Sequence, residues 1–457
     1  MIIFQQKRDI TVIFRDWVIA AKSVSLLFGT ITLVPLYFLL KRFFDDKISV
    51  LAMLVFALTP TLIHRSADLV RGPVCWFFSV LGLYLFVSQL DKRNHIYLLL
   101  SGLSFLMATW ARVEAVVFII VSCFYILVVK QERKFEKLVI FTIPVAILMF
   151  IAISGLIINT SHLNIFRYEK IMPYVSAPTA GYENLRLGLE HLRDQPLGPI
   201  GPWYIDWVRH LVWFIALGIL LTSMVHAFFY PFFIVFIAGL VGIRKRIKRD
   251  MRIPYFAFLS VGAFIILYLM VLRMQTMETR YVILFILSSS IFMGFGLEKV
   301  IRFIKSKFKL KESFALSIVC LLILACSLPK NLKPREADKL VFKEIGELIA
   351  GREGNKQEIL VVTSLHSIRW ISFYANVNYK GAPCPQKNYD LDNIIGKGYG
   401  EFVRNLRKRG IKYFLWEQKH WPKKSSYFIS SQNSEDFIKL GDWSHPDTGR
   451  MILFRVI

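Results

Sequence analysis

Residues 278–298 read ETRYVILFILSSSIFMGFGLE, a short charged and polar start followed by a long apolar run. An apolar run of this length can cross a bilayer as a helix. Ionised groups at the edge of hydrocarbon are costly unless they are paired or wetted, so they usually mark a path or a site. The stretch therefore predicts a membrane helix with functional side chains at its start.

The composition of the whole chain has the same character. The 457 residues are 55% hydrophobic and 15% aromatic, and the mean hydropathy is +0.49. A soluble domain cannot bury so many all-apolar segments, whereas a bilayer accommodates them. The net charge of +25 comes largely from Lys and Arg in short loops between apolar runs, the bias of cytoplasmic loops. The sequence predicts a polytopic α-helical membrane protein and argues against nucleic acid as a partner.

We predict about ten membrane spans within residues 20–328, with an outer loop at residues 160–206. The spans are Ala20 to Leu40, Ile48 to His64, Gly72 to Leu90, Ile96 to Trp110, Ala115 to Val129, Leu138 to Asn159, Val225 to Ile243, Ile253 to Leu272, Tyr281 to Glu298 and Ser313 to Leu328. This division places the basic loops on the cytoplasmic side. Trp207 to Met224 does not fit the alternation, so we expect it to lie in the interface or to re-enter the membrane.

The two ends of the chain differ from this central part. Residues 1–19 are mixed and polar and lack the order of a signal peptide. Because Ala20 to Leu40 must run inward, we expect residues 1–19 to be the remnant of an outer loop whose preceding span the sequence lacks. Residues 329–457 begin with a short basic linker and then alternate helix-like and strand-like segments, which predicts a soluble α/β domain on the exoplasmic side.

One predicted outer turn places Asp68 between Arg65 and Arg71. Asp68 can accept a proton or hold a divalent cation, and Arg71 can bind a phosphate, because a guanidinium fork suits phosphate oxygens. The alternative is a solvated turn with ion pairs. The cysteines show no CxxC spacing, and the sequence predicts no metal-ligand cluster.

Two further turns carry charges between apolar runs. Arg112 and Glu114 are two residues apart, so a mutual pair requires a turning backbone. Glu278, Arg280 and Tyr281 form the other group, in which Arg280 is a suitable phosphate ligand. The alternatives are an ordinary interfacial charge pair for the first, and a snorkelling arginine beside an interfacial tyrosine for the second.

Five stretches, taken in order, resemble the GT-C glycosyltransferase superfamily. They are Lys22 to Gly29, Ala57-Leu58-Thr59-Pro60, Asp68-Leu69-Val70-Arg71 leading into Trp76-Phe77-Phe78, Thr109 to Glu114, and Glu278-Thr279-Arg280-Tyr281. More narrowly, the chain is similar to the dolichyl-phosphate-mannose-protein mannosyltransferase and aminoarabinose transferase branch, including rhizobial galacturonosyltransferase-like proteins. The likeness covers residues 20 to 300 well.

The resemblance implies an inverting enzyme of the cell inner membrane. It would pass a sugar from a polyprenyl-phosphate donor to a lipid, glycan or protein acceptor on the outer face, using a carboxylate base and cations or a divalent metal at the phosphate. The family's principal acid lies in a first outer loop that this sequence lacks. Asp68 is therefore the candidate catalytic residue, with substrate-binding candidates Arg71, Arg112, Glu114, Glu278, Arg280 and Tyr281. The alternatives are a transporter or flippase for lipid-linked sugars and a catalytically inactive assembly subunit.

Overall fold

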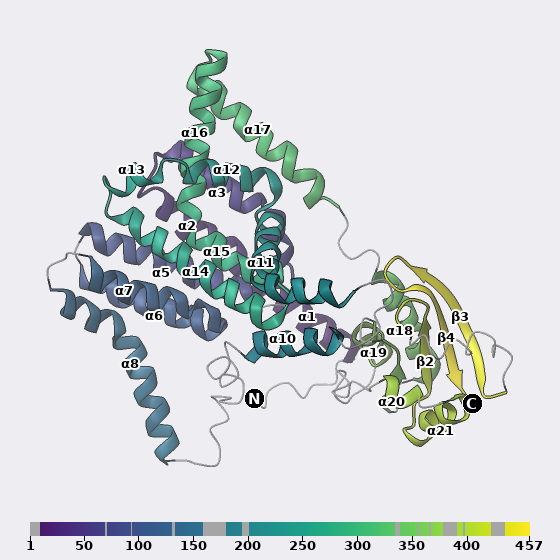
Figure 1. Ribbon diagram of the computed structural model, residues 1–457. Coiled ribbons are helices and arrows are strands. Elements are labelled where there is room, and N and C mark those ends of the chain that lie inside the picture. Colours follow the sequence, from purple (N-terminus) through teal and green to yellow (C-terminus); the bar gives the residue numbers. More distant parts are fainter. Residues whose placement is uncertain are drawn as a thin grey trace. The chain divides into compact units, whose positions relative to one another are not determined.

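The structure is a computed structural model that divides the chain into two compact units (Figure 1). It describes residues 10–68, 71–92, 94–129, 133–158, 180–193, 201–333, 339–354, 357–364, 367–377, 391–395, 398–421 and 435–457. One unit, Ala21–Leu332, is called the membrane unit below. The other comprises Lys333–Ile457 together with Met1–Ala20, and its Lys333–Ile457 part is called the C-terminal unit.

The membrane unit is built from helices, the first of which enters it from the residues before Ala21. They are α1 (Ile10–Ile31), α2 (Leu33–Leu40), α3 (Asp46–Leu58), α4 (Pro60–Ser66), α5 (Gly72–Lys92), α6 (His95–Ala111), the 3-10 turn η1 (Val113–Ala115), α7 (Val116–Val128), α8 (Lys134–Ile158), α10 (Ala180–Arg193), α11 (Pro202–Phe228), α12 (Tyr230–Leu240), α13 (Ile243–Ile247), α14 (Arg252–Met274), α15 (Thr279–Ser288), α16 (Ser290–Phe308) and α17 (Glu312–Asn331). Residues 1–9 of the predicted N-terminal remnant lie outside the described residues, and its remainder belongs to α1.

Among the described residues, five stretches of helix are long and apolar enough to cross a membrane, or up to seven if each bent pair is one span. Ala20–Leu40 and Gly72–Leu90 coincide with predicted spans. The predicted span Ile48 to His64 is broken into α3 and α4, which are bent by 60°, and Tyr281 to Glu298 is broken into α15 and α16, bent by 70°. Two predicted spans are therefore not straight helices.

Side-chain hydroxyls stabilise the break between α15 and α16. The Ser289 hydroxyl donates to the carbonyl of Phe285 at 2.6 Å, and Ser260 of α14 donates to the carbonyl of Ser288 at 3.3 Å. A broken helix frees carbonyls that hydrocarbon cannot solvate, so side chains must replace the lost partners. The serine run at residues 288–290 therefore supports a bend that hydropathy alone reads as a continuous span.

Glycines allow α12 and α16 to pack backbone against backbone. A Cβ added at Gly239 would lie 1.8 Å from the carbonyl oxygen of Phe292, and one at Gly296 would lie 1.9 Å from that of Val235. Neither distance is possible for a larger residue without separating the helices, which is how small residues promote helix contact in membranes. This contact fixes α16 and hence the bend that leads back to α15.

The middle of the chain is divided into helices differently from the prediction. Trp207 to Met224 is part of the 27-residue helix α11, which is apolar and long enough to cross a membrane. Val225 to Ile243 is not one helix, because α11 ends at Phe228, φ of Phe229 is +70°, and the 11-residue α12 follows. A positive φ is uncommon for a residue other than glycine. Hydropathy gives no information on backbone angles, so it could not predict a break at Phe229. The predicted outer loop also contains the helix α10.

The C-terminal unit is a small sheet with helices on both faces. Its elements are α18 (Leu340–Glu353), β1 (Val361–Val362), α19 (Ile368–Ala375), α20 (Leu391–Ile395), α21 (Tyr399–Lys408), β2 (Tyr413–Glu417), β3 (Phe437–His445) and β4 (Gly449–Val456). The strand order is β1-β2-β4-β3, with β1 parallel to β2 and the other pairs antiparallel. Successive residues of β2 face opposite sides: Tyr413 and Leu415 pack with α18 and α19, and Phe414 and Trp416 with α20 and α21.

Candidate functional site

Two arginines from distant parts of the membrane unit share one aromatic ring. The guanidinium carbon of Arg112 lies 4.8 Å from the ring centroid of Tyr281, and that of Arg280 lies 5.0 Å from it. Cation–π contacts of this kind are attractive and become stronger as water is removed. The ring thus keeps two positive charges close together that would otherwise repel each other.

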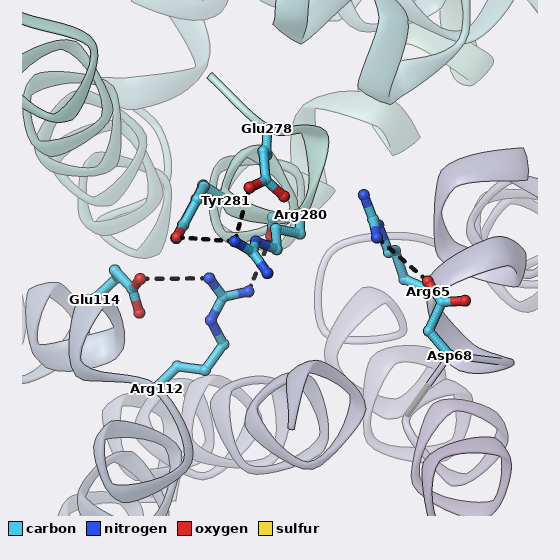
Figure 2. A network of polar contacts seen from close by, with 7 residues as sticks. All are labelled: Arg65, Asp68, Arg112, Glu114, Glu278, Arg280 and Tyr281. Carbon is cyan, nitrogen blue, oxygen red and sulfur yellow. Dashed lines mark hydrogen bonds and ion pairs between the residues drawn. The ribbon is translucent and has the colours of Figure 1, made fainter. Parts of the chain in front are cut away.

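Hydrogen bonds connect the same groups into one network, shown in Figure 2. Arg112 donates to a Glu114 carboxylate oxygen at 3.3 Å and to the carbonyl of Arg280 at 3.2 Å. Arg280 donates to Glu278 at 2.7 Å, and a longer contact of 3.4 Å reaches the hydroxyl of Tyr281. We call these five residues the mouth cluster. The structure brings together five of the seven predicted site residues.

The backbone explains why residues so close in sequence can meet. Helix α6 ends at Ala111, and Arg112 is extended, with φ −150° and ψ 121°, before η1 turns the chain through Glu114. This is the turning backbone that a pair two residues apart requires. On the other side, Glu278 has an extended conformation before α15 begins, so its carboxylate can reach Arg280 two residues later.

A small cavity of about 10 Å³ opens against the mouth cluster, and Cys75 and Trp76 of α5 contribute to its wall. Both of these side chains are buried. The Nε of Arg280 is also buried and has no hydrogen-bond partner among the described residues. A buried donor without an acceptor is unfavourable, so an oxygen brought by a ligand would be stabilised there.

The side chains of the mouth cluster differ in their exposure to solvent. The side chains of Arg112 and Glu114 are 18% and 20% exposed, whereas those of Arg280 and Glu278 are 39% and 47% exposed. Arg112 is therefore held on the inner side by its partners, and Arg280 lies where an incoming group can reach it. The charges together are two guanidiniums and two carboxylates.

Asp68 lies apart from the mouth cluster, as Figure 2 shows. One of its carboxylate oxygens accepts from Arg65 at 3.2 Å, and both side chains are partly buried. Arg71 lies just before α5, and its carbonyl accepts from the amide of Cys75. None of the hydrogen bonds and ion pairs given above joins either residue to the mouth cluster.

The described residues do not offer a preformed metal site. No group of three or more His, Cys, Asp or Glu side chains that could hold a metal occurs among them. Both carboxylates of the mouth cluster are already paired with arginines. The residues therefore do not fit a divalent cation, and no step of the chemistry below is assigned to one.

Sequence reasoning missed two contributions to this region. Cys75 was expected only as a residue of an apolar span, and Trp76 only as part of the stretch that follows Asp68 to Arg71, so neither was predicted to line a cavity. The available signal was the position of Trp76 in the sequence. It lies shortly after Gly72, where α5 begins, and is therefore close in the chain to the predicted turn that contains Asp68. Which wall of the cavity it forms depends on tertiary packing.

Taken together, these features define a class of protein: a polytopic helical membrane protein in which two arginines share an aromatic ring at the ends of its helices. Comparison with known proteins narrows this class. Residues 8–158, a third of the chain, match the sequence profile of the dolichyl-phosphate-mannose-protein mannosyltransferase family. No curated protein matches the chain.

Solved structures show the same fold. The oligosaccharyltransferase of Archaeoglobus fulgidus, solved in complex with Zn and sulfate, is 14% identical with a TM-score of 0.51 over 94% of this chain. The chain spans 61% of the length of that protein. ArnT from Cupriavidus metallidurans is 12% identical over 95% of this chain and 83% of its own length, but with a TM-score of 0.33 it carries no weight here.

The family match and the shared fold confirm the resemblance to the GT-C glycosyltransferase superfamily. They also confirm the predicted fold class, a polytopic helical membrane protein of GT-C type with a C-terminal α/β part. The chain is therefore an integral, multi-pass membrane protein whose fold is of GT-C type. Its donor, its acceptor and its reaction are matters of proposal.

Proposed function

We propose that the protein transfers a sugar from a polyprenyl-phosphate donor to a lipid, glycan or protein acceptor at the outer face of the inner membrane. The observation that carries the proposal is the pair of guanidiniums at the ring of Tyr281, one of them with a buried Nε that has no acceptor among the described residues. Such an arrangement suits a phosphate, whose oxygens accept several bonds at once. Its place at helix ends suits a phosphate attached to a membrane lipid.

In the proposed reaction, the acceptor oxygen forms a bond with the anomeric carbon while the bond from that carbon to the phosphate oxygen breaks. The electron pair of the broken bond goes to the phosphate, which leaves with one more negative charge. Arg280 and Arg112 stabilise this charge because their donors are already held in place before it develops. The configuration at the anomeric carbon is inverted by a single displacement.

The acceptor hydroxyl must lose a proton during this step. Asp68 is the candidate base, because a carboxylate near neutral pH can accept that proton. To do so it must exchange its bond with Arg65 for one with the acceptor. Arg71, close by in the chain, is proposed to bind an anionic group of donor or acceptor.

The location of the site is part of the same proposal. The basic stretches between helices, including the one around α13, predict the cytoplasmic side, which puts the mouth cluster and the C-terminal unit on the outer side. Cysteine substitutions at Asp68, Arg112 and Arg280, labelled with membrane-impermeant reagents, are expected to react from that side alone. Labelling from opposite sides would contradict the proposed topology.

The test of function is a transfer assay on the full chain in membranes, with a radiolabelled polyprenyl-phosphate sugar. We expect label to reach membrane acceptors with the natural chain, and Arg280→Ala to abolish this at equal protein abundance. Arg302→Ala on α16 is the matched control and should leave transfer intact. Movement of the lipid-linked sugar across the bilayer without transfer would support the transporter alternative instead, and neither movement nor transfer would support an inactive assembly subunit.

A further inference from the structure

A groove of about 590 Å³ runs along the exposed side of α21 in the C-terminal unit. Its charged and polar lining consists of Tyr399, Arg404, Arg407, Lys408 and Asp436. We call it the α21 groove. The opposite side of the helix, with Phe402 and Leu406, is buried against the sheet, so the cations of α21 are held on its outer side.

The charges of the α21 groove do not balance. Arg407 donates to one oxygen of Asp436 at 2.9 Å, and the hydroxyl of Tyr399 donates to the other at 3.0 Å. Arg404 and Lys408 have no ion-pair partner among the described residues. They are four residues apart on a helix, where like charges repel each other. The groove therefore contains two cations without counter-charges beside one carboxylate that is already engaged.

Some other cations of the C-terminal unit do have a carboxylate partner. Lys412 binds Glu353 at 2.7 Å, and Arg450 and Lys439 both bind Asp442. Lys343 and Glu347 form a pair along α18. In these places a cation and a carboxylate lie side by side, whereas Arg404 and Lys408 have no such partner among the described residues.

We propose that the α21 groove binds a phosphorylated saccharide. Arg404 and Lys408 supply cationic donors for the phosphate, which a guanidinium fork suits particularly well. Asp436 retains lone pairs that can accept from sugar hydroxyls, since a carboxylate can accept about four bonds. The volume falls within the range of small-molecule sites, about 300–1,000 Å³, and exceeds what an isolated ion needs.

The inference deepens the proposed function, because a phosphorylated saccharide at this place would be part of the acceptor. Its role as acceptor rests on that function, but binding itself does not. The two can therefore be tested apart, by measuring equilibrium binding in the absence of any lipid-linked donor.

The probe is glucose 1,6-bisphosphate, titrated calorimetrically into the full chain in detergent, with glucose and inorganic phosphate as comparison ligands. We expect the double variant Arg404→Gln, Lys408→Gln to bind the bisphosphate at least about tenfold more weakly, because it loses two charge-assisted contacts. The matched variant Lys343→Gln, Arg369→Gln removes the same charge from α18 and α19 and should bind within about twofold of the natural chain.

Three results would overturn the proposal. The first is equal binding by all three proteins, and the second is equal weakening in both double variants, which would indicate general electrostatic attraction. The third is inorganic phosphate binding as tightly as the sugar bisphosphate, which would indicate an ion site only.

Discussion

The bent pair α15–α16 carries one charged group at the start of α15 and another around Glu298, midway along α16 where its apolar run ends; the second is called the α16 end below. At the start of α15, Arg280 makes one short ion pair, and its buried Nε has no partner among the described residues. Midway along α16, Glu298 accepts from Arg246 at 2.8 Å and from Arg302 at 3.1 Å. The ammonium of Lys299 donates to the carbonyls of Ala238 and Val241, which end α12.

This difference distinguishes the charged group around Glu298, which stabilises the fold, from the mouth cluster, which has a donor available for a ligand. At the α16 end, Arg246 also lies 4.2 Å from the ring of Phe295, so both its charge and its flat face have partners. At the mouth cluster, two guanidiniums share the single ring of Tyr281, and donor capacity remains. Spare donors in a sheltered place are expected where an anion binds.

The largest effect on sugar transfer is expected when both arginines of one charged group are replaced, and the two groups can be compared in this way. We expect Arg112→Ala, Arg280→Ala to lower the rate of sugar transfer by at least about 10³-fold, because preorganised donors at a developing charge are worth this much or more. Arg246→Ala, Arg302→Ala removes the same charge from the other end and should change the rate by less than about threefold once abundance is matched. Similar losses in the two double variants would show that the ends do not differ in function.

Arg112→Lys keeps the positive charge at residue 112 and removes the planar guanidinium group. A lysine cannot bond Glu114 and the carbonyl of Arg280 in the same planar geometry. We expect transfer to fall about tenfold, at the scale of one well-placed bond of about 1.4 kcal/mol. Arg302→Lys is the control and should be neutral; full activity of Arg112→Lys would mean that only the charge of Arg112 matters.

The ring of Tyr281 can be separated from its hydroxyl. Tyr281→Leu removes the surface that both guanidiniums face, and we expect a loss of transfer of about five- to tenfold, in line with about 1 kcal/mol for a cation–π contact. Tyr281→Phe keeps the ring and loses only a contact of 3.4 Å, so its effect should be below about threefold. Kinetics on matched amounts of each variant will show the order, and a reversed order would assign the role to the hydroxyl.

Glu298→Gln tests the stabilising role of the α16 end. The variant leaves Arg246 and Arg302 without their shared carboxylate, and we expect a loss of about 1 kcal/mol in the free energy of unfolding, as these side chains are partly exposed. The melting temperature of the purified protein should fall while transfer per folded molecule stays constant. Lost transfer at unchanged melting temperature would contradict the division of roles.

A saturated charge cluster outside the membrane unit gives the smallest effect. The hydrogen bond from Arg450 holds the pKa of Asp442 at about 2, below the usual range of a carboxyl group. Because the folded-state pKa is lowered, its stabilising effect is present above about pH 4 and is lost as the pH falls towards 2. Asp442→Asn should therefore destabilise the protein by less than about 1 kcal/mol at pH 6 and leave it equal to the natural chain near pH 2. A difference that grows on acidification would contradict this assignment.

Hydropathy predicted much of this molecule because a bilayer imposes length and apolarity on every span. Residues 72–90 and 20–40 were delimited in this way, and the strand-like segments predicted in the C-terminal part include the largely buried strands β2 and β4. The edge strand β3 escaped prediction because most of its residues are exposed or half-buried. Hydropathy therefore located the segments that are largely buried and missed the edge strand, which is largely exposed.

Bends and long-range partners were beyond the sequence for a different reason. The break at Ser289 and the turn at Phe229 depend on helices that contact one another far along the chain, such as α12 and α16. The charged turns were visible, but the fact that Arg112 meets Arg280 while Asp68 turns to Arg65 is a property of packing. A single sequence contains no signal for which of three turns come together.

The most direct measurement of the central claim is equilibrium binding of undecaprenyl phosphate to the full chain in nanodiscs of neutral lipid. The account predicts saturable binding by the natural chain, unchanged binding by Arg302→Ala, and at least tenfold weaker binding by Arg280→Ala, since one charge-assisted contact is lost. Equal affinity of all three proteins would contradict the claim that the mouth cluster seats a lipid-borne phosphate.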